Sequence, residues 1–80
     1  MKNFIVTGGL GFIGSNLIEL LLEKKFRVIN IDKVSYASNF YNTREYYKNK
    51  NYIFIKLDIN NKKKIIKILK NYKPSGIFNL

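Results

Sequence analysis

The feature that most constrains this fold is a glycine-rich turn set directly between a β-prone run and a helical run. Residues 3–7 are short, apolar and rich in β-branched side chains, which is typical of a buried parallel strand. A strand that turns at once into a helix begins a β-α-β unit, and such units build parallel sheets. From residue 12 to about residue 24, apolar residues at helical spacing predict one buried face, made of Ile13, Leu17, Leu20 and Leu21 and widened by Ile18 and Leu22.

The rest of the chain continues the alternation of strands and helices. Three further strands are predicted at residues 27–31, 52–57 and 77–80. Residues 33–50 are polar and aromatic without a clear period, so we expect a loop with a short helix near residues 43–48. A second helix, capped by Asn60 or Asn61 and ended by Pro74, precedes the fourth strand. Its apolar stripe is predicted to consist of Ile65, Ile66, Ile68, Leu69 and Tyr72.

This order of elements predicts an α/β protein, namely the first half of a Rossmann-type domain. The parallel sheet should have the strand order 3-2-1-4, with right-handed crossovers. The last predicted strand should run on into a loop, so we expect residues 1–80 to be the incomplete N-terminal part of this Rossmann-type domain, truncated before its second half.

Composition excludes several classes of site. The chain has no Cys and no His, which argues against disulfides, zinc and a histidine base. No stretch approaches the roughly 20 apolar residues of a membrane helix, and no signal peptide is visible, so we expect a cytoplasmic location. The formal charge of +10 is compatible with a nucleic-acid binder, but the lysines are scattered. We therefore favour compositional drift, with neither nucleic acid nor membrane as a partner.

The glycines Gly8, Gly11 and Gly14 are spaced three residues apart at the strand-to-helix turn. Glycine permits the sharp turn, lets the backbone approach a pyrophosphate closely, and lets the helix pack tightly on the strand. The start of the helix offers unpaired N–H groups and the positive end of its dipole to phosphates. A turn that merely happens to be rich in glycine is the alternative, and the residue at the end of the second strand argues against it.

That residue is Asp32, which follows the glycines at about the 20-residue spacing of a dinucleotide site. A carboxylate there accepts hydrogen bonds from the adenosine ribose and repels a 2′-phosphate, so NAD is favoured over NADP. Lys33, the next residue, carries a positive charge that could tolerate a 2′-phosphate, which would allow NADP. Asp58 closes the third strand in the same way and could accept a bond from the adenine amino group, with Ile59 covering the ring. An ordinary turn aspartate before a helix cap is an equally good interpretation of Asp58.

Two further patterns look catalytic, and we attribute both to chance. Tyr-x-x-x-Lys spacing occurs at Tyr46 with Lys50 and at Tyr52 with Lys56, but the first lies too early in the chain and the second lies on a predicted strand. A Walker A loop would need lysine where Ser15 stands. We therefore predict no catalytic and no metal-ligating residue within these 80 residues.

The glycine segment, residues 7–15, resembles the opening of the extended short-chain dehydrogenase/reductases that act on nucleotide sugars. Residues 32–39 resemble the Asp-Lys-x-x-Tyr-Ala-Gly-Asn segment of the dTDP-glucose 4,6-dehydratases within that family. The resemblance covers essentially the whole chain. The chain departs from the pattern at Ser38, where Gly is usual, and at Asn79, where His is common.

The resemblance implies an NAD cofactor and a lyase that converts dTDP-glucose to dTDP-4-dehydro-6-deoxyglucose and water. Hydride would leave the sugar C4 for NAD, water would be eliminated across C5–C6, and the hydride would return to C6. The catalytic residues of the family would lie downstream, so the fragment alone should be inactive, and the parent should be a homodimer. A related epimerase or dehydratase and a non-catalytic dinucleotide-binding module remain alternatives. The implied NAD contacts are Phe12, Ile13, Asp32, Lys33, Val34, Ser35, Asp58, Ile59 and Leu80.

Overall fold

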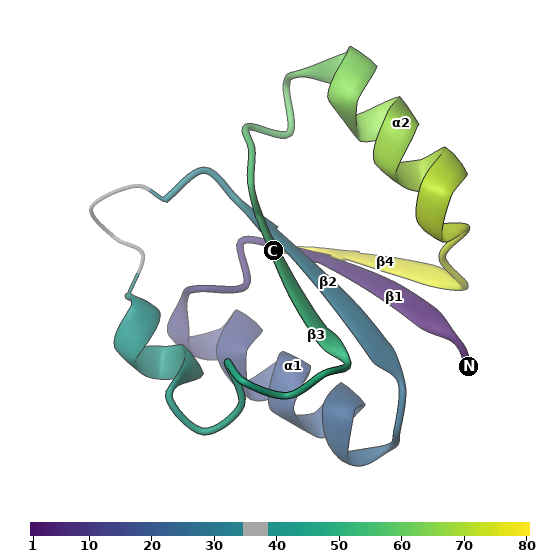
Figure 1. The fold of residues 1–80 in the computed structure, drawn as a ribbon. Coiled ribbons are helices and arrows are strands. Elements are labelled where there is room, and N and C mark those ends of the chain that lie inside the picture. Colours follow the sequence, from purple (N-terminus) through teal and green to yellow (C-terminus); the bar gives the residue numbers. More distant parts are fainter. Residues whose placement is uncertain (35–38) are drawn as a thin grey trace.

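The computed structural model describes residues 1–34 and 39–80, and within them the predicted alternation of strands and helices is confirmed. All paired strands run parallel, and the four-stranded sheet has the order β3-β2-β1-β4, as predicted (Figure 1). The elements are β1 (Asn3–Thr7), α1 (Phe12–Glu23), β2 (Arg27–Asp32), the short 3-10 helix η1 (Phe40–Thr43), β3 (Tyr52–Lys56), α2 (Lys62–Tyr72) and β4 (Gly76–Asn79).

The two helices lie on opposite faces of the sheet (Figure 1). Because side chains alternate along a strand, neighbouring residues of β1 enter different cores. Val6 packs in the core beneath α1, together with Val28 of β2. Ile5 packs in the core beneath α2, together with Ile29 of β2. Both faces of the central strands are therefore covered, which explains why these strands are apolar almost throughout.

The predicted buried face of α1 is only partly right. Leu21 is buried, but Ile13 and Leu20 are 74% and 49% exposed. Ile18 and Leu22, which the prediction placed at the side of this face, are buried as well, and Gly14 and Ser15 complete the buried side of α1. The physical reason is the contact of Gly14 with the preceding turn: it brings that side of the helix against the sheet and turns Ile13 outward.

The segment between β2 and β3 differs from the prediction in the position of its helix. The helical turn is η1, which starts three residues before the expected range 43–48 and overlaps it only at Thr43, and turns follow it. Asn39 caps η1 by accepting a hydrogen bond from the Tyr41 amide at 2.9 Å. Asn42 anchors it to the glycine-rich turn by donating to the Leu10 carbonyl oxygen at 3.1 Å. The Asn39 cap and the hydrogen bond from Asn42 to Leu10 hold the helical turn at this position. The spacing of apolar residues in the sequence does not indicate either contact.

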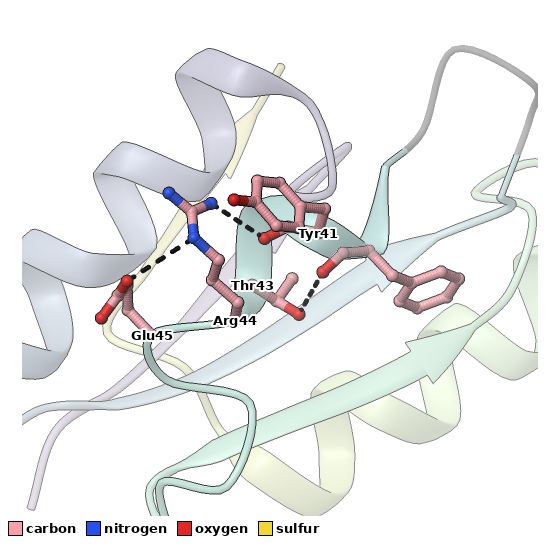
Figure 2. A network of polar contacts seen from close by, with 5 residues as sticks. Tyr41, Thr43, Arg44 and Glu45 are labelled. Carbon is pink, nitrogen blue, oxygen red and sulfur yellow. Dashed lines mark hydrogen bonds and ion pairs between the residues drawn. The ribbon is translucent and has the colours of Figure 1, made fainter.

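Polar contacts continue beyond η1 along the surface of the same segment. Figure 2 shows the Arg44 guanidinium, which donates to the Tyr41 carbonyl oxygen at 3.1 Å and pairs with Glu45 at 3.6 Å. The guanidinium also stacks over the Tyr41 ring, 4.0 Å from its centre. The Thr43 hydroxyl donates to the Phe40 carbonyl oxygen at 2.7 Å. The Arg44 contacts are exposed, whereas Thr43 is buried, and together they tighten a segment that has few apolar residues in the core.

The second helix follows the prediction closely. Asn61 is its cap and accepts a hydrogen bond from the Lys64 amide at 3.3 Å. Of the predicted stripe only Ile66 is exposed, while its other members contact the core beneath α2. Neither α1 nor α2, the α-helices that the structure describes, is long and apolar enough to cross a membrane.

Candidate functional site

A cavity of about 370 Å³ lies where the parallel strands end. Its walls come from the last residue of β1 and the turn after it, from the end of β2, from the segment after β3 and from the end of β4. In open parallel sheets this edge is where ligands bind. The cavity brings together seven of the predicted site residues: Gly8, Gly11, Asp32, Lys33, Asp58, Ile59 and Leu80.

The glycine-rich turn is held in a shape that only glycine permits at two positions. Gly8 has a φ of +72°, in the left-handed region that side chains rarely adopt. Gly14 has an ordinary helical conformation, but a Cβ there would lie 2.8 Å from both the Gly8 carbonyl oxygen and the Gly9 Cα. Gly8 is therefore required by backbone conformation, and Gly14 by the close approach of α1 to the turn.

Gly11 differs from these two glycines because neither its backbone conformation nor close packing requires glycine there. Its φ of −73° suits any residue. Within the described part of the chain, the single atom within 4 Å of an added Cβ is the Gly8 carbonyl oxygen, at 3.6 Å, an ordinary contact. Gly11 lines the cavity, so the space that a Cβ would occupy there is open to a ligand. A backbone surface kept bare in this way fits the close approach of a pyrophosphate.

The N-terminus of α1 begins at this bare surface. Gly11 is its N-cap, and no side chain among the described residues caps the helix. The first amides of an α-helix have no partner within the helix, and they carry the positive end of its dipole. The side chains of Phe12 and Ile13 are about three-quarters exposed, so these two predicted residues can offer their backbone amides and an apolar surface but do not line the cavity.

Asp32 is buried, with 7% of its surface exposed, yet it lines the cavity. One carboxylate oxygen accepts a hydrogen bond from the Leu10 amide at 3.1 Å, and the other accepts from the Val34 amide at 2.8 Å. The carboxylate is therefore fixed in orientation beneath the glycine-rich turn. Val34 has a φ of +60°, which is unusual for a β-branched residue. Ser35, another predicted contact, lies outside the described residues.

Asp58 combines the features of a turn residue and of a cavity-lining residue. Asp58 is exposed and accepts a hydrogen bond from the Asn60 amide at 2.9 Å, as a turn aspartate does. It also lines the cavity, next to Ile59, which is 47% exposed. Lys33 and Leu80 also line the cavity.

Two polar pairs at this site were missed by sequence reasoning. The Thr7 hydroxyl donates to the Asn79 side-chain oxygen at 2.5 Å, and both residues line the cavity. The Gly9 amide donates to the Asn30 side-chain oxygen at 3.0 Å. A signal for Asn30 was available, because an amide in an otherwise apolar strand, two residues before Asp32, must share its face.

The structure also describes a second cavity, of about 510 Å³, beside β3 and η1. Its lining is mainly aromatic, with Phe40, Tyr41 and Phe54 among its residues.

Tyr46 and Tyr52, the tyrosines of the two Tyr-x-x-x-Lys patterns, lie in a turn and on β3 respectively. Neither position places the tyrosine and its lysine on one helical face. Among the described residues, no group of three or more His, Cys, Asp or Glu could hold a metal ion.

The chain is similar to known enzymes over its whole length. A protein-family model described as GDP-mannose 4,6-dehydratase matches residues 5–80. A dTDP-glucose 4,6-dehydratase from Haemophilus influenzae is 43% identical over 81 aligned residues, which cover 100% of this chain and 24% of that protein. The chain thus spans about a quarter of the length of the relatives it matches.

Solved structures agree with this result. The dTDP-glucose 4,6-dehydratase of Bacillus anthracis, determined in complex with NAD, superposes with a TM-score of 0.93 at 33% identity, over 100% of this chain and 26% of that one. The UDP-glucose 4-epimerase of Thermotoga maritima, determined with UDP-glucose, superposes with a TM-score of 0.85 at 32% identity, over 99% of this chain and 24% of that one. The resemblance inferred from residues 7–15 and 32–39 is thereby confirmed, and the chain belongs to the GDP-mannose 4,6-dehydratase family, with dTDP-glucose 4,6-dehydratases among its relatives.

Proposed function

We propose that this chain forms the adenosine- and diphosphate-binding part of an NAD site in a dTDP-glucose 4,6-dehydratase. The observation that carries the proposal is the bare backbone at Gly11, which lines the same cavity as the buried carboxylate of Asp32. A surface without side chains at a helix N-terminus suits a diphosphate, and a fixed carboxylate in the same cavity suits the ribose. The relative from Bacillus anthracis, which was determined with NAD, supports the identity of the ligand.

The proposal gives each residue a role. The amides of Phe12 and Ile13 face the diphosphate, while Gly8 and Gly14 shape the turn that presents them. Asp32 accepts the ribose hydroxyls, Lys33 and Val34 contact the same ribose, and Asp58 and Ile59 contact the adenine. Ser35, which lies outside the described residues, stays an expected NAD contact. Leu80 borders the path toward the nicotinamide end. NAD, when bound, supplies the hydride acceptor for oxidation at the sugar C4. The residues of this chain bind and orient it.

The remaining steps of the reaction belong to the complete protein in this proposal. In this proposal residues 1–80 form the first part of the NAD-binding domain. The nucleotide sugar would bind mostly to other parts of the complete protein. We expect the 80-residue chain alone to bind the dinucleotide without dehydrating dTDP-glucose, and the complete lyase to be a homodimer.

A second candidate is an NAD-dependent nucleotide-sugar epimerase, favoured by the similarity to the UDP-glucose 4-epimerase of Thermotoga maritima. Both enzymes would need the same dinucleotide site. The products distinguish them, because a dehydratase releases water and leaves a 6-deoxy sugar, whereas an epimerase keeps every atom of the sugar. Mass spectrometry of the product made by the complete protein decides between the two.

The proposal is tested by titrating the chain with NAD and NADP and following the affinity calorimetrically. We expect NAD to bind about tenfold or more tightly than NADP, because the carboxylate of Asp32 repels a 2′-phosphate. Asp32→Asn should weaken NAD binding and reduce the difference in affinity between NAD and NADP. Glu45→Gln is the matched control, since Glu45 is exposed and lies away from the cavity. Equal affinities of the unaltered chain for NAD and NADP would contradict the proposal.

A further inference from the structure

Asn30 is a polar side chain in the middle of the sheet. It lies on β2, is fully buried at 0% exposure, and is flanked by Ile29 and Ile31, which pack in the core beneath α2. Its own side chain points to the opposite face, toward α1, because side chains alternate along a strand. Burial of an amide is unfavourable unless its groups are hydrogen-bonded, so its partners indicate why it is there.

Both ends of the Asn30 amide have a partner. The side-chain oxygen accepts a hydrogen bond from the Gly9 amide at 3.0 Å. The side-chain nitrogen donates to the Tyr52 hydroxyl at 3.0 Å, on the neighbouring strand β3. The hydroxyl thereby fixes the rotation of the amide and turns its oxygen toward the glycine-rich turn.

The turn is shaped to receive this oxygen. A Cβ on Gly9 would collide with the Asn30 side-chain oxygen and lie 2.6 Å from the Ile18 Cδ1 atom, so a side chain there would displace Asn30 or Ile18. Gly9 is not one of the three glycines of the predicted phosphate motif, and its contact with Asn30 explains why it too is glycine.

Asp32 completes the arrangement. It follows Asn30 by two residues and shares its face of β2, and it holds the next amide of the turn, that of Leu10, at 3.1 Å. Two alternate side chains of one strand therefore hold two successive amides of the turn from below. With those amides engaged, the turn is held in the shape that places Gly11, the N-cap of α1, at the cavity.

We propose that Asn30 is a positioning residue of the dinucleotide site, which holds the Gly9 amide and is itself oriented by the Tyr52 hydroxyl. The inference rests on the proposed function, because it assigns this contact to the site that binds NAD. Asn30 does not line the cavity, so it acts on the ligand through the shape of the turn. A merely structural Asn30 would stabilise the sheet as a whole without a specific effect on Gly9.

The test combines amide hydrogen exchange, measured by NMR on the 15N-labelled chain, with calorimetric titration of NAD. Asn30→Leu keeps the size of the side chain and removes both hydrogen bonds. We expect the Gly9 amide to exchange about tenfold or more faster relative to the strand amides of Val6 and Ile29, and NAD to bind about tenfold more weakly. Asn71→Leu makes the same chemical change at an exposed position on α2 and should leave both quantities unchanged.

Two further variants separate positioning from folding. Tyr52→Phe leaves Asn30 in place but removes its anchor, so Gly9 exchange should rise severalfold relative to the strand amides of Val6 and Ile29. Asn30→Asp keeps an oxygen where the Gly9 amide needs it and should restore most of the protection lost in Asn30→Leu. If Asn30→Leu fails to fold, Tyr52→Phe decides, and unchanged Gly9 exchange in that variant overturns the proposal.

The remaining outcomes are equally decisive. Gly9 exchange and NAD affinity within twofold of the unaltered chain in Asn30→Leu overturn the positioning role while leaving the proposed function intact. A chain that shows the protected Gly9 amide but does not bind NAD refutes the proposed function. That result overturns the assignment of Asn30 to a dinucleotide site and leaves the hydrogen bond as a structural contact.

Discussion

A Cβ on Gly14 would lie 2.8 Å from the carbonyl oxygen of Gly8, so the first turn of α1 rests directly on the backbone that follows β1. The neighbouring atoms are backbone and cannot move aside as a flexible side chain could. We therefore expect Gly14→Ala to lower the free energy of unfolding by about 1–3 kcal/mol, even though alanine favours helix. Urea unfolding followed by circular dichroism measures this. A variant as stable as the unaltered chain would show that the turn yields easily.

Gly11→Ala should affect NAD binding more than it affects stability. The Cβ would meet only an ordinary contact at 3.6 Å, so the stability loss should stay below about 1 kcal/mol, as for other N-cap changes from glycine to alanine. NAD binding should weaken by about tenfold or more, because the Cβ enters the space of the diphosphate. Calorimetric titration measures the affinity, with Gly14→Ala as the comparison. Unchanged NAD affinity in Gly11→Ala would place the diphosphate elsewhere.

The two tyrosines beneath α1 should respond differently to loss of their hydroxyls. The Tyr46 hydroxyl is buried and has no hydrogen-bond partner among the described residues, whereas the Tyr52 hydroxyl accepts a bond from Asn30. Tyr46→Phe should therefore raise the free energy of unfolding by about 1 kcal/mol, and Tyr52→Phe should lower it by about 1 kcal/mol. Urea unfolding at neutral pH compares them. Equal effects of the two substitutions would contradict the assignment.

The same tyrosines predict a loss of stability in alkali. Burial raises the pKa of Tyr46 above its usual value, with further contributions from Tyr52 and Glu19. Burial also raises the pKa of Tyr52, partly offset by the hydrogen bond from Asn30. Unfolded tyrosines lose their protons near pH 10, while these stay protonated in the folded state. The unfolded state then binds fewer protons, so stability is complete below about pH 10 and falls as the pH rises above it.

Urea unfolding between about pH 8 and pH 11 measures this slope. Because the shift is large for Tyr46, Tyr46→Phe should flatten the profile. Tyr47→Phe serves as the control, since Tyr47 is 56% exposed. A profile as steep in Tyr46→Phe as in the unaltered chain would assign the alkaline transition to other groups.

Lys25 is a site where glycine should stabilise the fold. Its φ is +67°, and it occupies the position after the end of α1 where the Phe26 amide donates to the Leu21 carbonyl oxygen at 3.2 Å. Glycine is preferred in this helix-ending motif. Lys25→Gly should raise the free energy of unfolding by about 0.5–1 kcal/mol, after the greater entropy of glycine in the unfolded chain is counted. Lys24→Gly, where φ is −79°, should give no gain.

The sequence by itself determined the order of elements, the parallel sheet with its 3-2-1-4 order, and the family. These follow from local patterns: apolar runs of strand length, helical periodicity in α2, a cap at Asn60 or Asn61 and the spacing of three glycines. The strand order followed from the Rossmann-type arrangement that the glycine-rich turn indicates. Asp32 was found because its place at the end of a strand and its distance from the glycines are both visible along the chain.

Only the tertiary structure decided which side of α1 is buried, where η1 begins, and what holds the glycine-rich turn. Each depends on contacts between residues far apart in sequence: Gly14 against Gly8, Asn42 against Leu10, and Asn30 against Gly9. Periodicity weighs a side chain only by its polarity. It therefore counted Ile13 as core and left Asn30 unexplained, whereas packing and hydrogen bonding in three dimensions exposed the first and buried the second.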